Sequence, residues 1–315
     1  MRCVDLFSGC GGLSQGFQNS GFDIIAAFDN WKEAADVYEM NFKHPCIVAD
    51  LREEEMVISK IAGLNPDIII GGPPCQDFSS AGKRDGSTEK ADLTRNFSNI
   101  ITKIKPNWFV MENVERIKGT QILEDITKQL MDSGYGLNGT ILDAAFCGVP
   151  QNRTRYFLIG CLGINHNTLT PMFKEKLTKN RMTIRDYFND SLGIEYYYRH
   201  PRSYARRAVF SIDEPSPTIR GVNRPVPRTY KKHRGDPVDP RKFGVKPLTT
   251  KQRSLVQTFP RSFKLSGTKT NQEQMIGNAV PVKLAEFVAN AIMSHSKANS
   301  IQKQEFSRPT KSLKP

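Results

Sequence analysis

The stretch CVDLFSGCGG, residues 3–12, joins a short apolar run to a glycine-rich turn, and apolar runs alternate with helical patterns up to about residue 160. Between the runs, stretches such as 31–42 and 94–105 place apolar residues at i, i+3 and i+4, the spacing of an amphipathic helix. The strand candidates are residues 3–7, 23–28, 46–48, 67–70, 108–111 and 155–160. Because strands that alternate with helices form parallel βαβ units, the sequence predicts an α/β fold with a doubly wound, mostly parallel sheet.

After this region the pattern changes. From about 162 to 245 the sequence is rich in Tyr, Arg, Pro and Gly and has no clean period. We therefore expect a first domain at residues 1–161 and a second, smaller and irregular domain at 162–245. A chain of this length can bury a core large enough for such a division.

The C-terminal segment, residues 246–296, regains helical spacing. Pro281 suits the first turn of a helix, and one face of that helix would carry Leu284, Val288 and Ile292. We expect this segment to pack back on the first domain. Residues 297–315 are polar, basic and Pro-containing, which predicts a flexible tail.

The composition favours a polyanionic partner. The 315 residues include 45 Lys and Arg against 32 Asp and Glu, for a formal net charge of +13, although charge alone leaves ribosomal, membrane-surface and nucleic-acid functions open. The six cysteines form no CxxC pair and have no nearby His at metal-ligand spacing, so we expect no metal site and no disulfide framework. Without a signal-peptide pattern or a membrane-spanning stretch, the protein is expected to be cytoplasmic.

The first candidate site is the turn at residues 5–12. Its glycines let the backbone approach a ligand closely, although a tight strand-to-helix turn explains them equally well. The second predicted strand ends at Asp29, where an acidic residue roughly twenty positions after a glycine turn often holds a ribose. Together these features favour a nucleoside cofactor. Asp50, after the third strand, is a candidate contact to the base of that cofactor or a helix N-cap.

The second candidate site is GGPPCQDFSS, residues 71–80, directly after a very apolar strand. Ligands bind at the carboxyl ends of the strands in an open parallel sheet, which places Cys75 where chemistry occurs. A buried packing cysteine is the ordinary alternative. It fits poorly, because two glycines and two prolines hold Cys75 in a loop outside any apolar face.

Charged residues mark two further strand ends. Glu112 lies at the end of the strand at 108–111, on the same predicted edge as Cys75, and a surface ion pair is its alternative role. Arg153 and Arg155 are two apart on an extended segment and therefore point to one face. A salt bridge to Glu112 and contact with a substrate carbonyl are both open, and they are compatible.

In order along the chain, DLFSGCGGLSQGF, PPCQ, ENV, QNRTR and QMIGNAVP resemble the motif set of the DNA cytosine-5 methyltransferases, in particular bacterial enzymes of the restriction-modification type. The resemblance covers residues 3–160 and about 247–292. It implies the Rossmann-like, mostly parallel sheet of class I S-adenosyl-L-methionine-dependent methyltransferases, with a catalytic domain at 1–161 and a target-recognition domain at 162–245. The implied cofactor is S-adenosyl-L-methionine, and the implied substrate is double-stranded DNA.

The resemblance also assigns roles to single residues. Cys75 would be the nucleophile and Glu112 would engage the N3 edge of cytosine. Arg155 would reach the O2 of the base, with Arg153 bracing the site. The implied cofactor-binding residues are Phe7, Gly9, Gly11, Asp29, Asp50, Leu51, Pro74, Asn278 and Val280. One departure concerns adenine stacking, because Asn30 stands where the family often has an aromatic residue after the ribose-binding acid.

The chemistry that the resemblance implies is demanding. Carbon 5 of cytosine is a poor nucleophile until a thiolate adds at C6, so Cys75 needs a positive neighbourhood to ionise. The target base must also leave the duplex, because none of these atoms can be reached inside stacked DNA.

The second region has the composition of a DNA-binding surface. Its basic residues outnumber its acidic ones and are interleaved with tyrosines, a pattern that suits phosphate and base-edge contacts better than a plain solvated face. Residues 214–219 resemble the threonine-containing stretch of the family's target-recognition domain. The predicted DNA-binding residues are Gln76, Ser79, Arg202, Arg206, Arg207, Thr218, Arg220 and Arg224.

Two other functions compete with this one. A branch of the same family methylates cytosine in tRNA with nearly the same motifs, and a non-catalytic DNA-binding protein on a similar scaffold is a different class. The intact PPCQ and ENV motifs argue against the second. We also expect a monomer associated with the nucleoid, and a cognate restriction endonuclease that acts on the same site without having to contact this chain.

Overall fold

A computed structural model describes residues 1–74, 89–203 and 205–306, with side chains for all of these except 89–92 and 299–306. Its centre is a seven-stranded sheet in the order β3-β2-β1-β4-β5-β8-β6. The strands are β1 (Arg2–Leu6), β2 (Asp23–Asp29), β3 (Cys46–Val48), β4 (Ile68–Gly71), β5 (Trp108–Val114), β6 (Tyr135–Asp143) and β8 (Thr154–Leu162). All neighbouring pairs among β1 to β5 are parallel, whereas β8 runs antiparallel to β5 and β6. The predicted mostly parallel α/β sheet is confirmed.

β6 is the strand that the sequence pattern did not predict. Its residues, YGLNGTILD, include two glycines, which weaken a strand by propensity. Tertiary contacts require both of them. A Cβ on Gly136 would lie 1.7 Å from the Ile164 carbonyl oxygen, and a Cβ on Gly139 would lie 2.5 Å from the Tyr156 hydroxyl. Packing against β8 and the loop after it therefore overrides the local preference.

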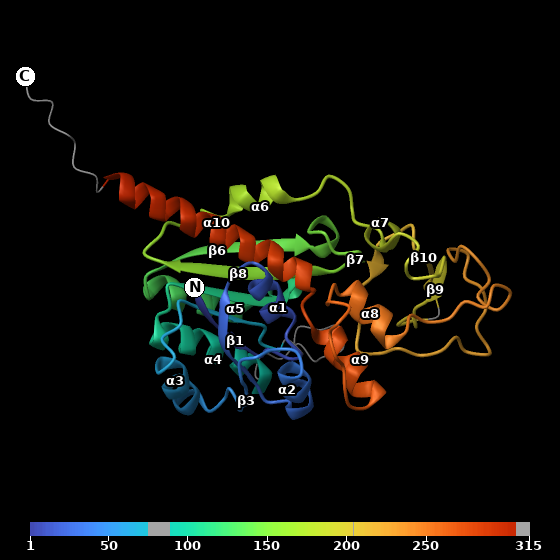
Figure 1. The fold of residues 1–315 in the computed structure, drawn as a ribbon, viewed down its shortest axis with the longest axis horizontal. Coiled ribbons are helices and arrows are strands. Elements are labelled where there is room, and N and C mark those ends of the chain that lie inside the picture. Colours follow the sequence, from blue (N-terminus) through green and yellow to red (C-terminus); the bar gives the residue numbers. More distant parts are fainter. Residues whose placement is uncertain (75–88, 204, 307–315) are drawn as a thin grey trace, which may run out of the picture.

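Helices cover both faces of the sheet (Figure 1). One face packs against α1, α6 and α10, and the other packs against α3, α4 and α5. These helices and α2 are α1 (Gly12–Asn19), α2 (Lys32–Glu39), α3 (Glu54–Ala62), α4 (Glu89–Ile104), α5 (Gln121–Asp132), α6 (Thr170–Lys176) and α10 (Val282–Phe306), with 3-10 turns at Glu115–Ile117 and Ala144–Phe146. Coverage on both faces explains why the central strands are almost continuously apolar.

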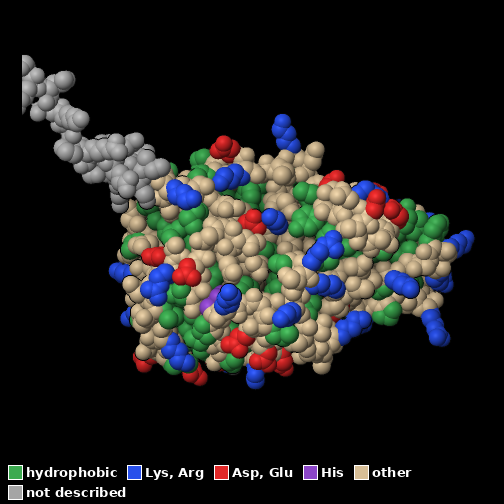
Figure 2. All heavy atoms as spheres, in the orientation of Figure 1, with side chains coloured by type: hydrophobic (Ala, Val, Ile, Leu, Met, Phe, Trp, Pro, Cys, Tyr) green, Lys and Arg blue, Asp and Glu red, His purple; other side chains and the backbone are tan. Residues whose placement is uncertain are grey.

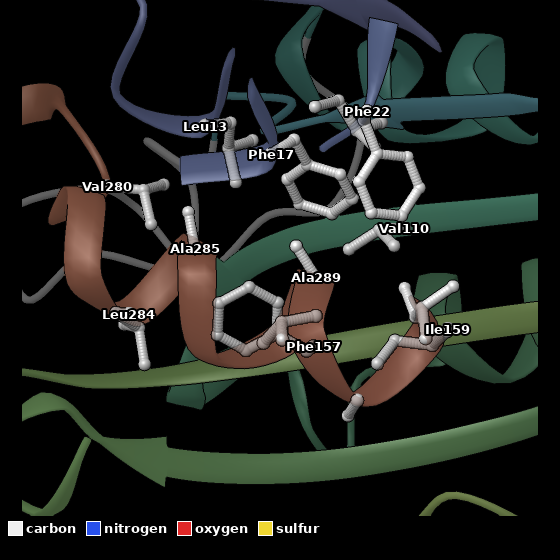
Figure 3. Close-up of a cluster of buried hydrophobic side chains, with 14 of the residues drawn as sticks. Leu13, Phe17, Phe22, Val110, Phe157, Ile159, Val280, Leu284, Ala285 and Ala289 are labelled. Atoms are coloured by element: carbon white, nitrogen blue, oxygen red, sulfur yellow. The ribbon is translucent and has the colours of Figure 1, made fainter. Parts of the chain in front are cut away.

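α10 returns the C-terminal segment to the sheet. The predicted apolar face is fully buried and comprises Leu284, Val288 and Ile292. It packs against α1 and the sheet in one apolar cluster (Figure 3). α1 and α10 approach closely, because a Cβ on Gly16 would lie 2.5 Å from the Ala285 Cβ. The helix continues past the predicted boundary at residue 296, and residues 307–315 lie outside the described chain.

A smaller, irregular lobe projects beside the sheet lobe (Figure 1). Its elements, with the two helices that join it to the sheet lobe, are α7 (Ile184–Phe188), β9 (Tyr196–Tyr198), β10 (Val209–Ser211), β11 (Ser216–Pro217), α8 (Thr250–Val256) and α9 (Lys269–Asn278). A polar centre holds its loops together, since the buried Asp236 carboxylate accepts hydrogen bonds from Ala208 N, Val209 N, His233 N and the Tyr230 hydroxyl.

The chain continues to pack with the sheet lobe after β8. Leu169 and Phe173, in and before α6, are buried in the core of that lobe. The next helix, α7, follows Thr183 and contributes Ile184 and Phe188 to a cluster of the smaller lobe. The lobes are joined by a parallel pair of short strands, β11 with β7 (Gln151–Asn152).

Candidate active site

A cavity of about 380 Å³ lies at the carboxyl ends of β1, β2, β4 and β5. The end of α9 and the connection from α9 to α10 line it as well. Its lining includes Phe7, Gly9, Asp29, Trp31, Pro74, Glu112, Arg153, Arg155, Asn278 and Val280. Ligands bind at this position in open α/β sheets.

The turn after β1 forms one wall of this cavity. Gly9 has a positive φ of 53°, and a Cβ there would meet nothing within 4 Å, so the wall at this point is bare backbone facing open space. Phe7 also lines the cavity and has a positive φ of 57°. Gly11 has a different position. It precedes α1, and a Cβ there would lie 2.3 Å from the Phe42 ring, so its contact is with the core behind the wall.

Asp29, at the end of β2, is 8% exposed and fixes the edge of the cavity. Its two oxygens accept hydrogen bonds from Gly9 N at 2.7 Å and from Trp31 N at 2.8 Å. Burial raises the pKa of this carboxyl, and the backbone N–H donors oppose that rise. Trp31 lines the cavity as well, and the sequence analysis missed it. The available signal was an aromatic side chain two residues after the acid, one position beyond Asn30.

The two residues predicted to contact adenine lie elsewhere. The Asp50 carboxylate pairs with Arg52 at 2.6 Å, which lowers the pKa of Asp50. Leu51 is buried in the apolar core between the sheet and α3 to α5. Neither is among the described residues that line the cavity. The helix N-cap alternative for Asp50 does not hold either, because Glu53 precedes α3.

The described part of the loop after β4, residues 72–74, lines the cavity. Pro74 lines it, and Cys75 is the next residue in sequence. The predicted residues Cys75, Gln76 and Ser79 lie outside the described residues. Gly72 lies close to a neighbouring carboxylate, since a Cβ at this position would be only 3.2 Å from Glu112 Oε2.

Glu112, on β5, is a buried carboxylate that faces the cavity. Arg155 Nε on β8 lies 2.8 Å from Glu112 Oε1, in an ion pair of which both members are largely buried. Burial raises the pKa of Glu112, while Arg155 and Arg153 oppose the rise. The antiparallel pairing of β5 with β8 brings these side chains together, so the salt-bridge role left open for Arg155 is present.

Arg153 is fully buried and joins three parts of the chain. Its Nη1 donates to the carbonyl oxygens of Ile219 and Gly277, each at 3.2 Å, and its Nη2 donates to Asn278 O at 3.4 Å. Burial lowers the pKa of the guanidinium. Its Nε has no hydrogen-bond partner among the described residues. Arg153 therefore ties the sheet lobe to Ile219 of the smaller lobe and to the end of α9.

The last predicted motif completes the wall. Asn278 and Val280 line the cavity from the α9–α10 connection. The connection lies against the start of α1, where a Cβ on Gly12 would be 2.3 Å from Val280 O. Gln274 donates a 2.7 Å hydrogen bond to the Asn278 side chain and fixes its orientation.

The predicted DNA-binding residues of the smaller lobe lie outside the cavity lining. Thr218 contacts the segment that leads to Arg153, because its hydroxyl donates to Asn152 O at 2.7 Å. Arg220 donates to His200 O, and Arg207 pairs with Glu214 and stacks on Phe210. The exposed members are Arg202, Arg206 and Arg224. Lys and Arg side chains are prominent on the outer rim of this lobe (Figure 2).

Arg199 was not predicted and lies behind these residues. It donates a 2.9 Å hydrogen bond to Thr218 O, and burial lowers its pKa to about 10. Within the described part of the chain, no group of His, Cys, Asp and Glu is arranged to hold a metal. No helix there is long and apolar enough to cross a membrane.

The fold belongs to the class of Rossmann-like α/β folds. Two solved structures share it. The Entamoeba histolytica methyltransferase EhMeth superposes with a TM-score of 0.70 at 18% identity, covering 94% of this chain and 98% of that chain. The S. pombe Dnmt2 methyltransferase superposes with a TM-score of 0.69 at 16% identity, covering 94% and 99%.

Within this class, the chain belongs to the C-5 cytosine-specific DNA methylase family, whose model matches residues 1–294. The predicted enzyme class, DNA cytosine-5 methyltransferase, is thereby confirmed, and so is DNA as the substrate. The type II methyltransferase M.HindV of Haemophilus influenzae is 60% identical over 94% of this chain and 98% of its own length. M.HgiDI of Herpetosiphon aurantiacus is 52% identical over 94% and 95%.

Proposed function

We propose that the cavity holds S-adenosyl-L-methionine and that the enzyme methylates carbon 5 of a cytosine flipped out of duplex DNA. The residues present fit this cofactor. Asp29 would accept hydrogen bonds from the ribose, and the bare backbone at Gly9 leaves room beside it. Trp31 would contact the adenine in place of Leu51, whose side chain belongs to the core. When bound, the cofactor would supply an electrophilic methyl group.

The catalytic step would use Cys75 and Glu112. A bond from the Cys75 thiolate to C6 pushes electron density toward N3 of the ring, and Glu112 can donate a proton there. The raised pKa of this buried carboxyl favours the protonated form that such a donation needs. Arg155 would hold Glu112 in place. After methyl transfer, loss of the C5 proton and elimination of Cys75 restore the aromatic ring.

The observation that carries this proposal is the shared cavity. Asp29, Pro74, Glu112 and Arg155 come from four different strands or the loops after them, and they line one space. A cofactor bound by Asp29 and a base held by Glu112 would then lie within reach of each other. The cytosine must be extruded to reach Glu112, at a cost of roughly a few kcal/mol that contacts from the basic smaller lobe can offset.

The biological role proposed is protection of host DNA beside a restriction endonuclease. The relatives reported above are named type II methyltransferases, which supports a modification enzyme with one target sequence. We also propose a cytoplasmic monomer that associates with the nucleoid. Genomic DNA from cells that express the chain should resist cleavage by an endonuclease whose site overlaps the methylated one.

The direct test is methyl transfer from labelled S-adenosyl-L-methionine by the purified protein. Label should enter duplex DNA, and bisulfite sequencing should place it at cytosines of one sequence. Transfer into tRNA with none into duplex DNA would instead favour the RNA branch. No transfer to either would contradict the proposed function.

A further inference from the structure

α9 is shared by the two lobes. Its last turn brings Gly277 to the cavity wall, and the same turn packs directly on residues 220–221 of the smaller lobe. A Cβ on Gly277 would lie 2.3 Å from Gly221 N, and a Cβ on Gly221 would lie 2.0 Å from Gln274 Oε1. The end of α9 and residues 220–221 are in close contact, so neither can move toward the other without displacing it.

A buried ion pair fastens this contact. Arg253 of α8 is 4% exposed and Glu273 of α9 is 3% exposed, and their side chains pair directly. Arg253 also donates to Arg220 O. The other oxygen of Glu273, Oε1, accepts hydrogen bonds from Asn223 Nδ2 and Thr250 Oγ1, each at 2.8 Å. The pair therefore contacts α8, α9 and residues 220–224 of the smaller lobe, which we call the recognition segment.

This recognition segment carries candidate DNA contacts at both ends. Arg220 begins it, and the exposed Arg224 follows Asn223. From the sheet lobe, Arg153 holds Ile219 O and Gly277 O with one nitrogen. If the recognition segment shifts when DNA binds, the C-terminal turn of α9 must therefore shift with it, and this turn forms part of the cavity wall.

Stability alone is a weak explanation for a buried pair of this kind. The desolvation of two charges offsets much of their attraction, and apolar side chains of similar volume are often as stabilising. What charged groups add is a fixed geometry, because Glu273 must keep its three partners or leave a charge unsatisfied.

We propose that Arg253 and Glu273 are positioning residues that couple DNA binding by the smaller lobe to cofactor binding in the cavity. The proposal rests on the proposed function, which places these two ligands. Coupling here means that bound DNA changes the affinity for the cofactor, and that bound cofactor changes the affinity for DNA by the same factor. Neither Arg253 nor Glu273 has to touch a ligand to have this effect. Removing the pair should abolish that change while each ligand still binds alone.

The test uses S-adenosylhomocysteine, the product left after methyl transfer, as a probe that does not react. Its Kd is measured by calorimetry with and without a saturating duplex that carries the methylated site. For the wild-type protein we expect about tenfold tighter binding in the presence of the duplex, within the usual range of allosteric coupling. For Glu273→Gln we expect a change below about twofold, with the Kd in the absence of DNA preserved.

Arg185→Gln is the matched control. Arg185 pairs with Asp213 and Glu195 on the surface of the smaller lobe, so its loss removes an ion pair that does not include α9, and coupling should remain. Where Glu273→Gln does not fold, Arg253→Lys keeps a buried cation and loses the reach to Arg220 O, and it is judged by the same criterion.

Wild-type coupling that persists in Glu273→Gln would overturn the proposal, even if the melting temperature falls. Cofactor binding by the wild-type protein that DNA leaves unchanged would overturn it too. If S-adenosylhomocysteine fails to bind the wild-type protein at all, the proposed function fails first and this proposal falls with it.

Discussion

The two lobes differ in how they hold their buried carboxyl groups. In the sheet lobe, Asp5, Asp29 and Glu112 are buried at or near the cavity, and burial raises the pKa of each. In the smaller lobe, burial also acts to raise the pKa of the Asp236 carboxyl, but hydrogen bonds from Tyr230 and from three backbone N–H groups outweigh it, so this pKa is lowered. A carboxyl group with a raised pKa can exchange a proton, whereas one with a lowered pKa remains a fixed anion. The groups suited to proton exchange therefore lie in the sheet lobe, which agrees with the chemistry proposed there.

The lobes also differ in what holds them together. The sheet lobe depends on strand ladders and two large apolar clusters, while the smaller lobe depends on polar centres such as Asp236 and on two small clusters. Substitutions in the sheet lobe should therefore change rate or cofactor affinity, and substitutions on the smaller lobe should change the choice of DNA. Each prediction below tests that separation.

The largest effect is expected for Glu112→Gln. The amide cannot donate the proton that the attacked ring takes up, so kcat should fall by about 10² to 10⁴, the range for loss of a general acid. Cofactor affinity should stay close to that of the wild-type protein. The exposed neighbour Glu115 supplies the control, because Glu115→Gln should retain kcat. An unchanged kcat for Glu112→Gln would show that Glu112 does not donate this proton.

A smaller loss is expected for Asp29→Ala. Without the carboxylate, the ribose hydroxyls and two backbone N–H groups lose their partner, which should weaken S-adenosyl-L-methionine binding by about 1 to 3 kcal/mol. Asp23→Ala, at the exposed other end of β2, is the control and should bind normally. Equal dissociation constants for both variants, measured by calorimetry, would show that the cofactor does not bind at Asp29 in this cavity.

In the smaller lobe, alanine variants of Arg202, Arg206, Arg220 and Arg224 should divide into two groups. Arginines that bond a guanine edge contribute about 1 to 3 kcal/mol of discrimination, while those on phosphates add affinity that salt weakens. Methylation of a library with a randomised site, at two salt concentrations, separates the groups. Lys174→Ala, which changes an exposed side chain on α6, should affect neither. If every arginine variant slows methylation without changing the preferred site, the lobe is a general DNA clamp.

Per pH unit, the smallest effect is on stability. Burial raises the pKa of Asp5 from 3.8 to about 7, so between these values the folded protein holds a proton that the unfolded chain has lost. The free energy of unfolding should therefore fall as pH rises through this range, by up to about 1.4 kcal/mol per pH unit from this group. Asp5→Asn should show a shallower fall in urea unfolding, and Glu55→Gln, an exposed change, should match the wild-type slope. If the free energy of unfolding depends on pH in the same way for the wild-type protein, Asp5→Asn and Glu55→Gln, the raised pKa of Asp5 is contradicted.

The regular lobe was the more predictable one. The apolar run at 46–48 became β3, and the i, i+4 spacing of Leu284, Val288 and Ile292 became the buried face of α10. Alternation of strands and helices was enough to place Asp29 and Glu112 at one edge of the sheet, since the carboxyl ends of parallel strands share that edge.

Other features depended on distant contacts that no local pattern carries. The glycines of β6 are required by Ile164 and Tyr156. Leu51 turned into the core and Trp31 took a place on the cavity wall, because the loop after each strand decides which neighbouring side chain faces the ligand. The partners of Arg153 are backbone carbonyl oxygens far along the chain, and the Arg253–Glu273 pair joins helices with no shared motif.

We propose that the sheet lobe performs covalent chemistry through Cys75. A duplex with 5-fluorocytosine at the methylated position, incubated with S-adenosyl-L-methionine and resolved under denaturing conditions, tests this step directly. Fluorine cannot leave carbon 5 as the proton does, so the wild-type protein should remain covalently attached to the DNA, and Cys75→Ala should release it completely. Equal trapping of the wild-type protein and Cys75→Ala would contradict the account.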